Sequence, residues 1–251
     1  MRFAALILAG VLMGAGAAAA QEETIKLPAQ DFSFDGPFGT FDRAAAQRGF
    51  QVYKEVCSNC HSMKELYYRN LEGIGLTPDQ VKAVAASVTV PGDLNDQGQP
   101  TERPGLPADH FRSPFPNDLA ARAANNGALP PDQSVLEKAR EGGATYIYDL
   151  LNGYRDAPAG MKIGDGLYYN LYFPGHQIGM PQPLHDGQVT YADGTPATVE
   201  QMSRDVVTFL TYAANPEMEQ RKRMGVRIVL FLIGMSCVTY AVKRKIWADV
   251  H

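Results

Sequence analysis

The feature that most constrains this chain is the pentapeptide Cys57-Ser58-Asn59-Cys60-His61, which has the spacing C-x-x-C-H. Two thiols at this spacing can each form a thioether to one edge of a porphyrin. The histidine that follows then lies beneath the ring, with a nitrogen directed at the iron. The pentapeptide therefore predicts a covalently attached c-type haem, with His61 as the proximal iron ligand.

Three other uses of a C-x-x-C pair fit the sequence less well. A thioredoxin-like redox pair is typical of a βαβ pattern, but here the motif follows a helix-like stretch. A zinc site needs further Cys or His ligands at compatible spacing, and the only other cysteine, Cys237, lies far away in an apolar run. A disulfide across two intervening residues would be strained and would leave His61 unexplained.

The first 20 residues have the pattern of a secretory signal peptide: Arg2, an apolar centre over residues 3–11, and then Ala18-Ala19-Ala20. The pattern predicts cleavage before Gln21. A retained membrane anchor is the weaker alternative, because the apolar centre is short. Export would place the two haem cysteines outside the cytoplasmic membrane of a bacterium, or in the equivalent organelle space, where haem is attached to c-type cytochromes.

A second apolar stretch, residues 224–242, predicts one transmembrane helix. At about 1.5 Å rise per residue it spans roughly 28 Å, which is enough to cross a hydrocarbon core. Arg227 in its first turn is interpreted as an interfacial anchor. Basic residues flank both ends, so charge alone does not orient the helix, whereas the signal peptide makes it a stop-transfer segment. The predicted organisation is a signal peptide (1–20), a periplasmic haem domain (21–220), a transmembrane helix (221–243) and a cytoplasmic tail (244–251).

The segment 21–220 is strongly acidic. It contains 26 Asp and Glu residues against 15 Lys and Arg residues, a net charge of −11, whereas the whole chain has a net charge of −4. Such a field attracts a basic partner protein in a salt-dependent way and repels nucleic acid. The alternative is that the acidic surface only keeps an exported protein soluble.

Helical periodicity predicts a mostly α-helical domain of the cytochrome c type. A helix is expected over residues 42–56, with Asp42 as its N-cap, and another over residues 199–213, with Thr198 and Gln201 forming a capping box. Gly49 in the first helix costs about 1 kcal/mol relative to alanine, and a close crossing with the last helix would explain it.

Between these helices the sequence predicts shorter helices and long loops. The helices are expected over residues 117–126, from Pro130 to Gly142, and around residues 146–151. Residues 91–116 are rich in Pro, Gly and Asp and are expected to form a surface loop. A minor β-hairpin is expected around Val189 and Tyr191.

The sixth iron ligand must come from far along the chain, and a buried, low-spin electron carrier requires a His or a Met. Met180 is the strongest candidate, because Gly179 and the flanking prolines hold an extended backbone that can carry a thioether across the haem face. Met161 and His176 remain alternatives. A Met ligand raises the haem potential relative to two His ligands.

Several motifs in one order resemble the cytochrome c1 family, the haem c subunit of the cytochrome bc1 complex. They are AARAANNGALPPD at 120–132, GLYYN at 166–170, FPG at 173–175 with IGM at 178–180, DGTPAT at 193–198, and RKRMG at 221–225 before the apolar run. The resemblance extends from about Phe32 to Trp247. It covers nearly all of the chain that follows the predicted signal peptide.

The resemblance implies that His61 and Met180 are the two iron ligands of a single haem c, held through Cys57 and Cys60. It also implies that the haem pocket includes Asn125, Ala128, Pro130, Pro131, Leu136, Tyr146, Leu150, Leu151, Phe173, Ile178 and Pro183. In the family, an arginine after the double proline meets a haem propionate. Arg140 matches that position, on the same face as Leu136 of the expected helix, and Arg122 is the alternative.

The implied function is electron transfer within a ubiquinol–cytochrome c oxidoreductase. The haem would accept an electron from a Rieske iron–sulfur protein and pass it to a soluble, basic c-type cytochrome, next to cytochrome b in a dimeric complex. The subunit alone would only transfer electrons. Two alternatives remain: an independent membrane-anchored c-type shuttle, and a haem sensor or enzyme with an open sixth site, in which Met180 only packs.

Overall fold

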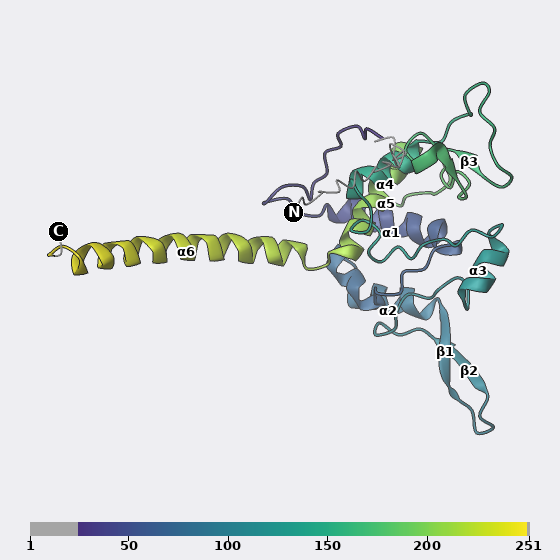
Figure 1. The fold of residues 1–251 in the computed structure, drawn as a ribbon. Helices are drawn as coiled ribbons and strands as arrows, with labels where there is room; N and C mark the ends of the chain where they lie inside the picture. The colour runs from purple at the N-terminus through teal and green to yellow at the C-terminus, as the bar shows by residue number, and fades with distance from the viewer. Residues whose placement is uncertain (1–24, 250–251) are drawn as a thin grey trace, which may run out of the picture.

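Two helices far apart in the sequence, α1 (Arg43–Glu55) and α5 (Val199–Ala214), cross at the centre of the folded domain (Figure 1). The structure is a computed structural model that describes residues 25–249. The predicted signal peptide, residues 1–20, lies outside the described residues. The mostly helical fold class predicted from the sequence is confirmed, as are these two helices.

The caps of the two helices explain where they begin. The Asp42 side chain accepts hydrogen bonds from the amides of Ala44 and Ala45 at the start of α1. Thr198 accepts from the amide of Gln201 at the start of α5. The expected capping box is incomplete, because the Gln201 side chain donates to Asp205 instead of reaching back to the cap. Each cap satisfies amides that have no partner within the helix.

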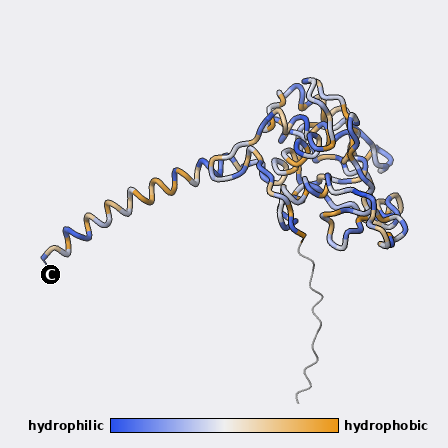
Figure 2. Tube along the Cα trace, turned by 90° about the horizontal axis from the view of Figure 1, so that it is seen from above, coloured by the Kyte–Doolittle hydropathy of each residue, from blue (hydrophilic) through white to orange (hydrophobic). Residues whose placement is uncertain are grey.

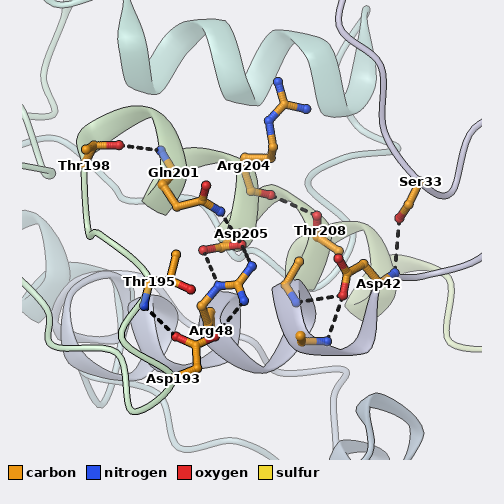
Figure 3. Close-up of polar contacts among 12 residues, drawn as sticks. Ser33, Asp42, Arg48, Asp193, Thr195, Thr198, Gln201, Arg204, Asp205 and Thr208 are labelled. Atoms are coloured by element: carbon orange, nitrogen blue, oxygen red, sulfur yellow. Dashed lines mark hydrogen bonds and ion pairs between the residues drawn. The ribbon is translucent and has the colours of Figure 1, made fainter.

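Gly49 lies at the crossing of α1 and α5, as the sequence predicted. A Cβ atom at this position would lie 1.9 Å from the backbone oxygen of Asp205, so only glycine fits there. An ion pair fixes the crossing beside it: Arg48 donates two hydrogen bonds of 2.9 Å to Asp205 and one to Asp193 (Figure 3). Asp205 is completely buried. Removal of Arg48 alone would leave a buried charge unpaired, at a cost of about 3–5 kcal/mol.

Aromatic side chains fill the core beside this crossing. The rings of Phe50 and Tyr53 on α1 each lie within 6 Å of the ring of Phe209 on α5. Phe111 joins them and stacks on Tyr68 at a centroid distance of 4.6 Å. Burial of this face positions the end of α1, and therefore the C-x-x-C-H segment that follows it.

Two of the predicted shorter helices are present and one is absent. Helix α3 (Asp118–Ala124) is capped by Asn117, and α4 (Gly143–Asn152) packs on α5. The predicted helix from Pro130 to Gly142 is wrong, since this segment forms successive turns. The reason is that Asp132 and Gln133 form hydrogen bonds with residues 62–64, which replace the first turn of a helix.

The region before α3 contains structure that the sequence interpretation missed. A 3₁₀ helix (Tyr68–Ile74) precedes α2 (Pro78–Ala86), which begins with a complete capping box between Thr77 and Gln80. Strands β1 (Thr89–Leu94) and β2 (Pro100–Pro104) form an antiparallel hairpin that projects from the domain in Figure 1.

The expectation of a loop over residues 91–116 is therefore wrong for its first part. Prolines occur in both strands, but a two-stranded ribbon leaves one edge of each strand unpaired, so a residue without an amide hydrogen is tolerated there. The hairpin expected at Val189 and Tyr191 is also wrong. Both side chains are buried, and their alternation reflects packing into the core and not strand pairing.

A second, smaller ladder lies on the other side of the domain. Strands β3 (Tyr168–Tyr169) and β4 (Gln177–Ile178) pair in antiparallel fashion, and a short 3₁₀ turn (Pro174–His176) leads into β4. Ile178 pairs with Tyr168, which places the following residues, Gly179 and Met180, at the end of this ladder.

After α5 the chain turns at Asn215 and enters α6 (Met218–Ile246), which extends away from the rest of the chain (Figure 1). Figure 2 shows that the middle of α6 is hydrophobic. The apolar part has a mean hydropathy of 1.9 and none of it is buried by the residues that the structure describes. A helix of this length, exposed and apolar on all sides, fits a single membrane anchor.

Candidate haem site

The C-x-x-C-H segment begins where α1 ends. Residues Cys57–Asn59 form a 3₁₀ turn, and the amides of Cys60 and His61 both donate to the carbonyl oxygen of Cys57. The Ser58 hydroxyl donates to the carbonyl of Lys54, and the Asn59 side chain donates to the carbonyl of Glu55. The two residues between the cysteines therefore satisfy carbonyls of the last turn of α1.

Both cysteines are free thiols, and their environments differ. Cys57 is half-buried against the hydrophobic core, whereas Cys60 is exposed. Burial raises the pKa of the Cys57 thiol to about 12. The two sulfurs are unpaired, three positions apart, and neither is engaged in a disulfide.

His61 is buried, and its ring is fixed by one hydrogen bond. Its Nδ1 atom lies 2.8 Å from the carbonyl oxygen of Pro131. A carbonyl oxygen only accepts hydrogen bonds, so Nδ1 carries the proton and Nε2 keeps its lone pair. Burial lowers the pKa of His61, although the bond to Pro131 opposes this effect. The side chain is thus a neutral imidazole, and the lone pair of its Nε2 atom can coordinate a metal.

A dense set of hydrogen bonds joins residues 57–65, which we call the proximal loop, to residues 131–134. The carboxylate of Asp132 accepts from the Ser62 hydroxyl at 2.7 Å, from the Lys64 amide at 2.9 Å and from the Ser134 amide at 2.9 Å. The Gln133 amide donates to the carbonyl of Ser62. Burial alone would raise the pKa of Asp132, but these hydrogen bonds hold it below its usual range.

Met180 lies at the end of a second irregular segment, residues 154–180, which we call the distal loop. Its side chain is half-buried and packs against the same core as Cys57. The Tyr154 hydroxyl donates to the Met180 carbonyl at 3.0 Å. Gly179 lies against Ala128, because a Cβ atom at residue 179 would lie 3.2 Å from the Ala128 methyl group.

Asn170 fixes the distal loop to the end of α4. It is completely buried, its side chain donates to the carbonyl of Leu150 at 2.8 Å, and it accepts from the amide of Tyr172 at 2.9 Å. The Leu171 amide also donates to the carbonyl of Gly153. The position of Met180 therefore depends on the C-terminal end of α4.

The predicted pocket residues lie on the segments that surround the two loops. Leu151 and Ile178 are buried, and Pro131 and Arg140 are exposed. The half-buried ones are Asn125, Ala128, Pro130, Leu136, Tyr146, Leu150, Phe173 and Pro183. Leu151 belongs to the same hydrophobic core against which Leu136, Tyr146, Cys57 and Met180 pack.

The two alternative sixth ligands are placed differently from Met180. Met161 lies in an irregular part of the distal loop, half-buried, and is not among the described residues that pack against the core. The Nδ1 atom of His176 lies 3.1 Å from the carbonyl oxygen of Asn170, and the ring lies beside that of Tyr169. Packing of its thioether on the core favours Met180.

The arginines predicted near a propionate are both exposed. Arg122 donates to the carbonyl of Gly127 at 3.0 Å and so closes the end of α3. Arg140 donates to the carbonyl of Ala139. Burial raises the pKa of the Tyr146 phenol, and the positive charge of Arg140 partly opposes this rise. The expected helical face shared by Leu136 and Arg140 is absent, because residues 134–142 form turns, and the electrostatic effect on Tyr146 is what supports Arg140 among the described residues.

Sequence reasoning missed three residues that position the site: Asp132, Tyr154 and Asn170. Asp132 had a recognisable signal, because an aspartate two residues before a serine commonly accepts a hydrogen bond from that amide. Tyr154 and Asn170 act on residues 20 or more positions away, at Met180 and Leu150, and carry no local signal. Together, the thiols of Cys57 and Cys60, the neutral imidazole of His61 and the Met180 side chain that packs on the core have the chemistry that a covalently attached haem requires.

The chain matches the family model of the Cytochrome C1 family over residues 32–250. It is 47% identical to "Cytochrome c1" of Rhodospirillum rubrum, with 98% of this chain and 97% of that protein covered. It is 46% identical to "Cytochrome c1, heme protein, mitochondrial" of Saccharomyces cerevisiae, with 94% and 77% covered. It is also 48% identical to "Cytochrome b/c1" of Bradyrhizobium diazoefficiens, with 98% of this chain and 39% of that protein covered.

Proposed function

Because the chain belongs to the cytochrome c1 family, we propose that it is the haem c subunit of a cytochrome bc1 complex. In this proposal Cys57 and Cys60 attach the haem, and His61 and Met180 bind its iron. The observation that carries it is the bond between His61 Nδ1 and the Pro131 carbonyl oxygen, which leaves Nε2 free directly after the cysteine pair.

When bound, the haem supplies a one-electron iron couple. The residues of the chain hold its coordination in one geometry, so that little reorganises when the charge changes. Pro131 orients the His61 ring, and the distal loop holds Met180 through Tyr154 and Asn170. Apolar side chains such as Leu151 and Ile178 exclude water, which together with a Met ligand favours a high potential.

The proposed partners follow from charge and from the relatives. The electron donor is a Rieske iron–sulfur protein and the acceptor is a soluble, basic c-type cytochrome, which suits the net charge of −11 over residues 21–220. Cytochrome b is the proposed neighbour in the membrane, and the printed name of the Bradyrhizobium relative joins the two cytochromes. The complex as a whole is a quinol–cytochrome c oxidoreductase and is proposed to be dimeric, while this subunit only transfers electrons.

The proposed location is the cytoplasmic membrane of a bacterium, with the haem domain in the periplasm and the C-terminus in the cytoplasm. Support comes from the signal-peptide pattern of the first 20 residues and from α6 as a stop-transfer helix. Relatives with the name cytochrome c1 occur in bacteria.

The test of this function is purification of the full chain in mild detergent from its own membranes. Reduced-minus-oxidised spectra are recorded before and after addition of a ubiquinol analogue. The proposal expects b-type haems to co-purify and quinol to reduce the c haem in an inhibitor-sensitive way. A chain that is isolated alone even after gentler extraction, with a c haem that quinol does not reduce, would support a membrane-anchored shuttle instead.

A second test addresses the ligand on the distal loop. Met180→Leu is expected to leave the haem attached, to lower its potential and to allow carbon monoxide to bind the reduced protein. Met161→Leu is the matched control, because it changes a methionine of the same loop that does not pack against the core. An unchanged potential in Met180→Leu would remove Met180 from the coordination shell, and carbon monoxide binding to the unchanged protein would favour a sensor or enzyme with an open sixth site.

A further inference from the structure

A buried carboxylate on α4, that of Asp149, has no cationic partner among the described residues. Asp149 is 3% exposed, and the Nε2 atom of Gln30 donates one hydrogen bond of 3.2 Å to its Oδ1 atom. The second oxygen, Oδ2, has no hydrogen-bond partner within residues 25–249. A buried carboxylate that is neither paired with a positive charge nor fully hydrogen-bonded is costly in its ionised form.

Asp205 on α5 shows how the same domain holds a buried charge elsewhere. Asp205 is also inaccessible to solvent, but Arg48 donates two hydrogen bonds to it and Gln201 donates a third. No arginine or lysine of the described chain pairs with Asp149 in this way. Burial raises the pKa of Asp149, and the hydrogen bond from Gln30 only partly opposes the rise. Asp149, unlike Asp205, is therefore a buried carboxylate that can accept a proton above the ordinary aspartate pKa of about 4.

The charged groups that pack closest to this side of α4 are engaged with other partners. Arg204 of α5 donates to the Gln30 side chain and to the backbone carbonyl of Asp31. Its guanidinium lies over the ring of Tyr148, 5.1 Å from the ring centroid. The Asp31 side chain is exposed. Gln30 thus separates the guanidinium of Arg204 from the carboxylate of Asp149 and bonds to both.

The other ionisable groups near Asp149 belong to α4 itself and to the segment that follows it. Tyr146 and Tyr148 are phenols and carry no positive charge. Arg155 donates to two backbone carbonyls that are close to it in the sequence. None of these groups bonds to Asp149, so the carboxylate is not neutralised from this side either.

The neighbours of Asp149 on α4 connect it to the proposed haem. Leu150 and Leu151 are predicted pocket residues, and Leu151 belongs to the core on which Met180 packs. The Leu150 carbonyl also holds Asn170 of the distal loop. Consecutive residues of a helix are separated by about 1.5 Å along its axis. Reduction adds one negative charge to a haem, and a charge about 12 Å away changes a proton affinity by roughly tenfold at an effective dielectric constant near 20.

We propose that Asp149 is a redox-linked proton site. Its carboxylate takes up one proton from the solvent when the haem is reduced and releases that proton when the haem is oxidised. The electron comes from the proposed Rieske donor and leaves to the proposed acceptor, and at Asp149 only one O–H bond forms and breaks. Gln30 is half-buried and reaches both the carboxylate and the surface, so the proton exchanges with solvent beside it. This inference rests on the proposed function, because it requires the haem.

The test is a redox titration of the c haem at a series of pH values, with the full chain purified together with the proteins that accompany it. A protonated Asp149 favours the reduced haem, so the potential of the unchanged chain should fall as the pH rises through the range in which Asp149 titrates. There each pH unit changes the ratio of reduced to oxidised haem by up to about tenfold, which is 59 mV for one electron. Asp149→Asn is always neutral. It should lose this slope and keep the higher, acid-limit potential.

Two further variants make the result specific. Asp31→Asn is the matched control, because it removes the same charge from an exposed side chain next to Gln30, and its pH profile should match that of the unchanged chain. Gln30→Ala keeps the carboxylate but removes its one hydrogen bond, so the pH-dependent range should move to higher pH. Gln30 is half-buried in an irregular segment, so this variant also serves if Asp149→Asn does not fold.

Infrared spectra give a readout that is independent of the potential. In the reduced-minus-oxidised difference, the carbonyl stretch of a protonated carboxyl group should appear for the unchanged chain and be absent from Asp149→Asn. Identical pH profiles in the unchanged chain, Asp149→Asn and Gln30→Ala would overturn the proposal, as would loss of the slope in Asp31→Asn. Absence of c-haem absorbance from the unchanged chain would instead contradict the proposed function itself, so the two failures are distinguishable.

Discussion

The proximal and distal loops differ in the kind of polar side chain that ties each of them to a neighbouring segment. The proximal loop is held by Asp132, a half-buried carboxylate that accepts hydrogen bonds from two residues of the loop and one of its own segment. The distal loop is held by Asn170, a completely buried amide that donates to one segment and accepts from another. On our proposal the first loop is also attached covalently to the haem, whereas the second has no covalent bond to it and is positioned by hydrogen bonds and packing. The distal loop should therefore depend more strongly on its one buried amide.

The largest effect is expected from Asn170→Ala. The change leaves the Tyr172 amide without its acceptor and removes one of the two hydrogen bonds to the Leu150 carbonyl, which keeps the Gly153 amide, at a cost of about 1–3 kcal/mol. It should loosen the distal loop, so that Met180 leaves the iron in part of the population. Denaturant unfolding and carbon monoxide binding to the reduced protein measure the two effects.

The control for this change is Asn152→Ala. Asn152 is also an amide near the end of α4, but its side chain donates only to Tyr148, one turn back on the same helix. Asn152→Ala should lower the free energy of unfolding by less than about 1 kcal/mol and leave carbon monoxide binding unchanged. If both variants bind carbon monoxide equally, α4 as a whole positions the ligand and Asn170 has no special part.

A smaller effect is expected from Asp132→Asn. Asparagine keeps only one acceptor oxygen, so its NH2 group points either at the Ser134 amide or at the side of Ser62 and Lys64, where the native partners donate. The free energy of unfolding should fall by about 1–2 kcal/mol. On our proposal, thioether bonds from Cys57 and Cys60 would keep the haem in place, so the haem content and the carbon monoxide response should not change. Asp96→Asn, in the exposed turn of the β1–β2 hairpin, is the control. Loss of haem from Asp132→Asn would show that the carboxylate is needed during attachment.

The same contrast explains how much of the site was predictable from the sequence. The C-x-x-C-H segment is local, so five adjacent residues are enough to predict the proximal side, and the structure adds the Pro131 contact to His61. The role of Gly49 was also predictable, because a glycine inside a helix is unfavourable and a close crossing with another helix explains its presence. Met180 was only the strongest of three candidates on local grounds, since its position depends on Tyr154 and Asn170, which are distant in sequence.

The errors in the fold have the same origin. Residues 130–142 have helical spacing, but the hydrogen bonds of Asp132 and Gln133 to the proximal loop override that local preference. The β1–β2 hairpin contains prolines that argue against strands in a large sheet but not in an isolated ribbon. In both cases the outcome depends on whether a partner segment is present, which spacing does not reveal.

A third prediction tests the hydrogen bond between Tyr154 and the Met180 carbonyl. Tyr154→Phe removes the hydrogen bond to the Met180 carbonyl and should cost about 0.5–1.5 kcal/mol of unfolding free energy. Burial raises the pKa of Tyr154, so the phenol is protonated and able to donate throughout the usual pH range. Redox titration should show a smaller shift of the haem potential than in Asn170→Ala. Tyr168→Phe, a change at a more exposed tyrosine of β3, should leave both quantities unchanged, and a shift of similar size there would argue against the Tyr154 bond.

The smallest expected effect separates the two loops by pH, because Asp132 of the proximal contacts is a carboxylate that titrates in acid, whereas the side-chain amide of Asn170 does not titrate. The pKa of Asp132 is lowered in the folded chain, so its stabilisation is fully present above the ordinary aspartate pKa of about 4 and is lost as the pH falls below it. Amide hydrogen exchange of Lys64 and Ser134, which donate to Asp132, should therefore lose protection only as the pH falls below about 4, after correction for intrinsic exchange rates. The Tyr172 amide donates to Asn170 and should keep its protection over the same range. Asp132→Asn should abolish the pH step, whereas equal loss at all three amides would mean that acid loosens the whole domain and that the two loops do not differ.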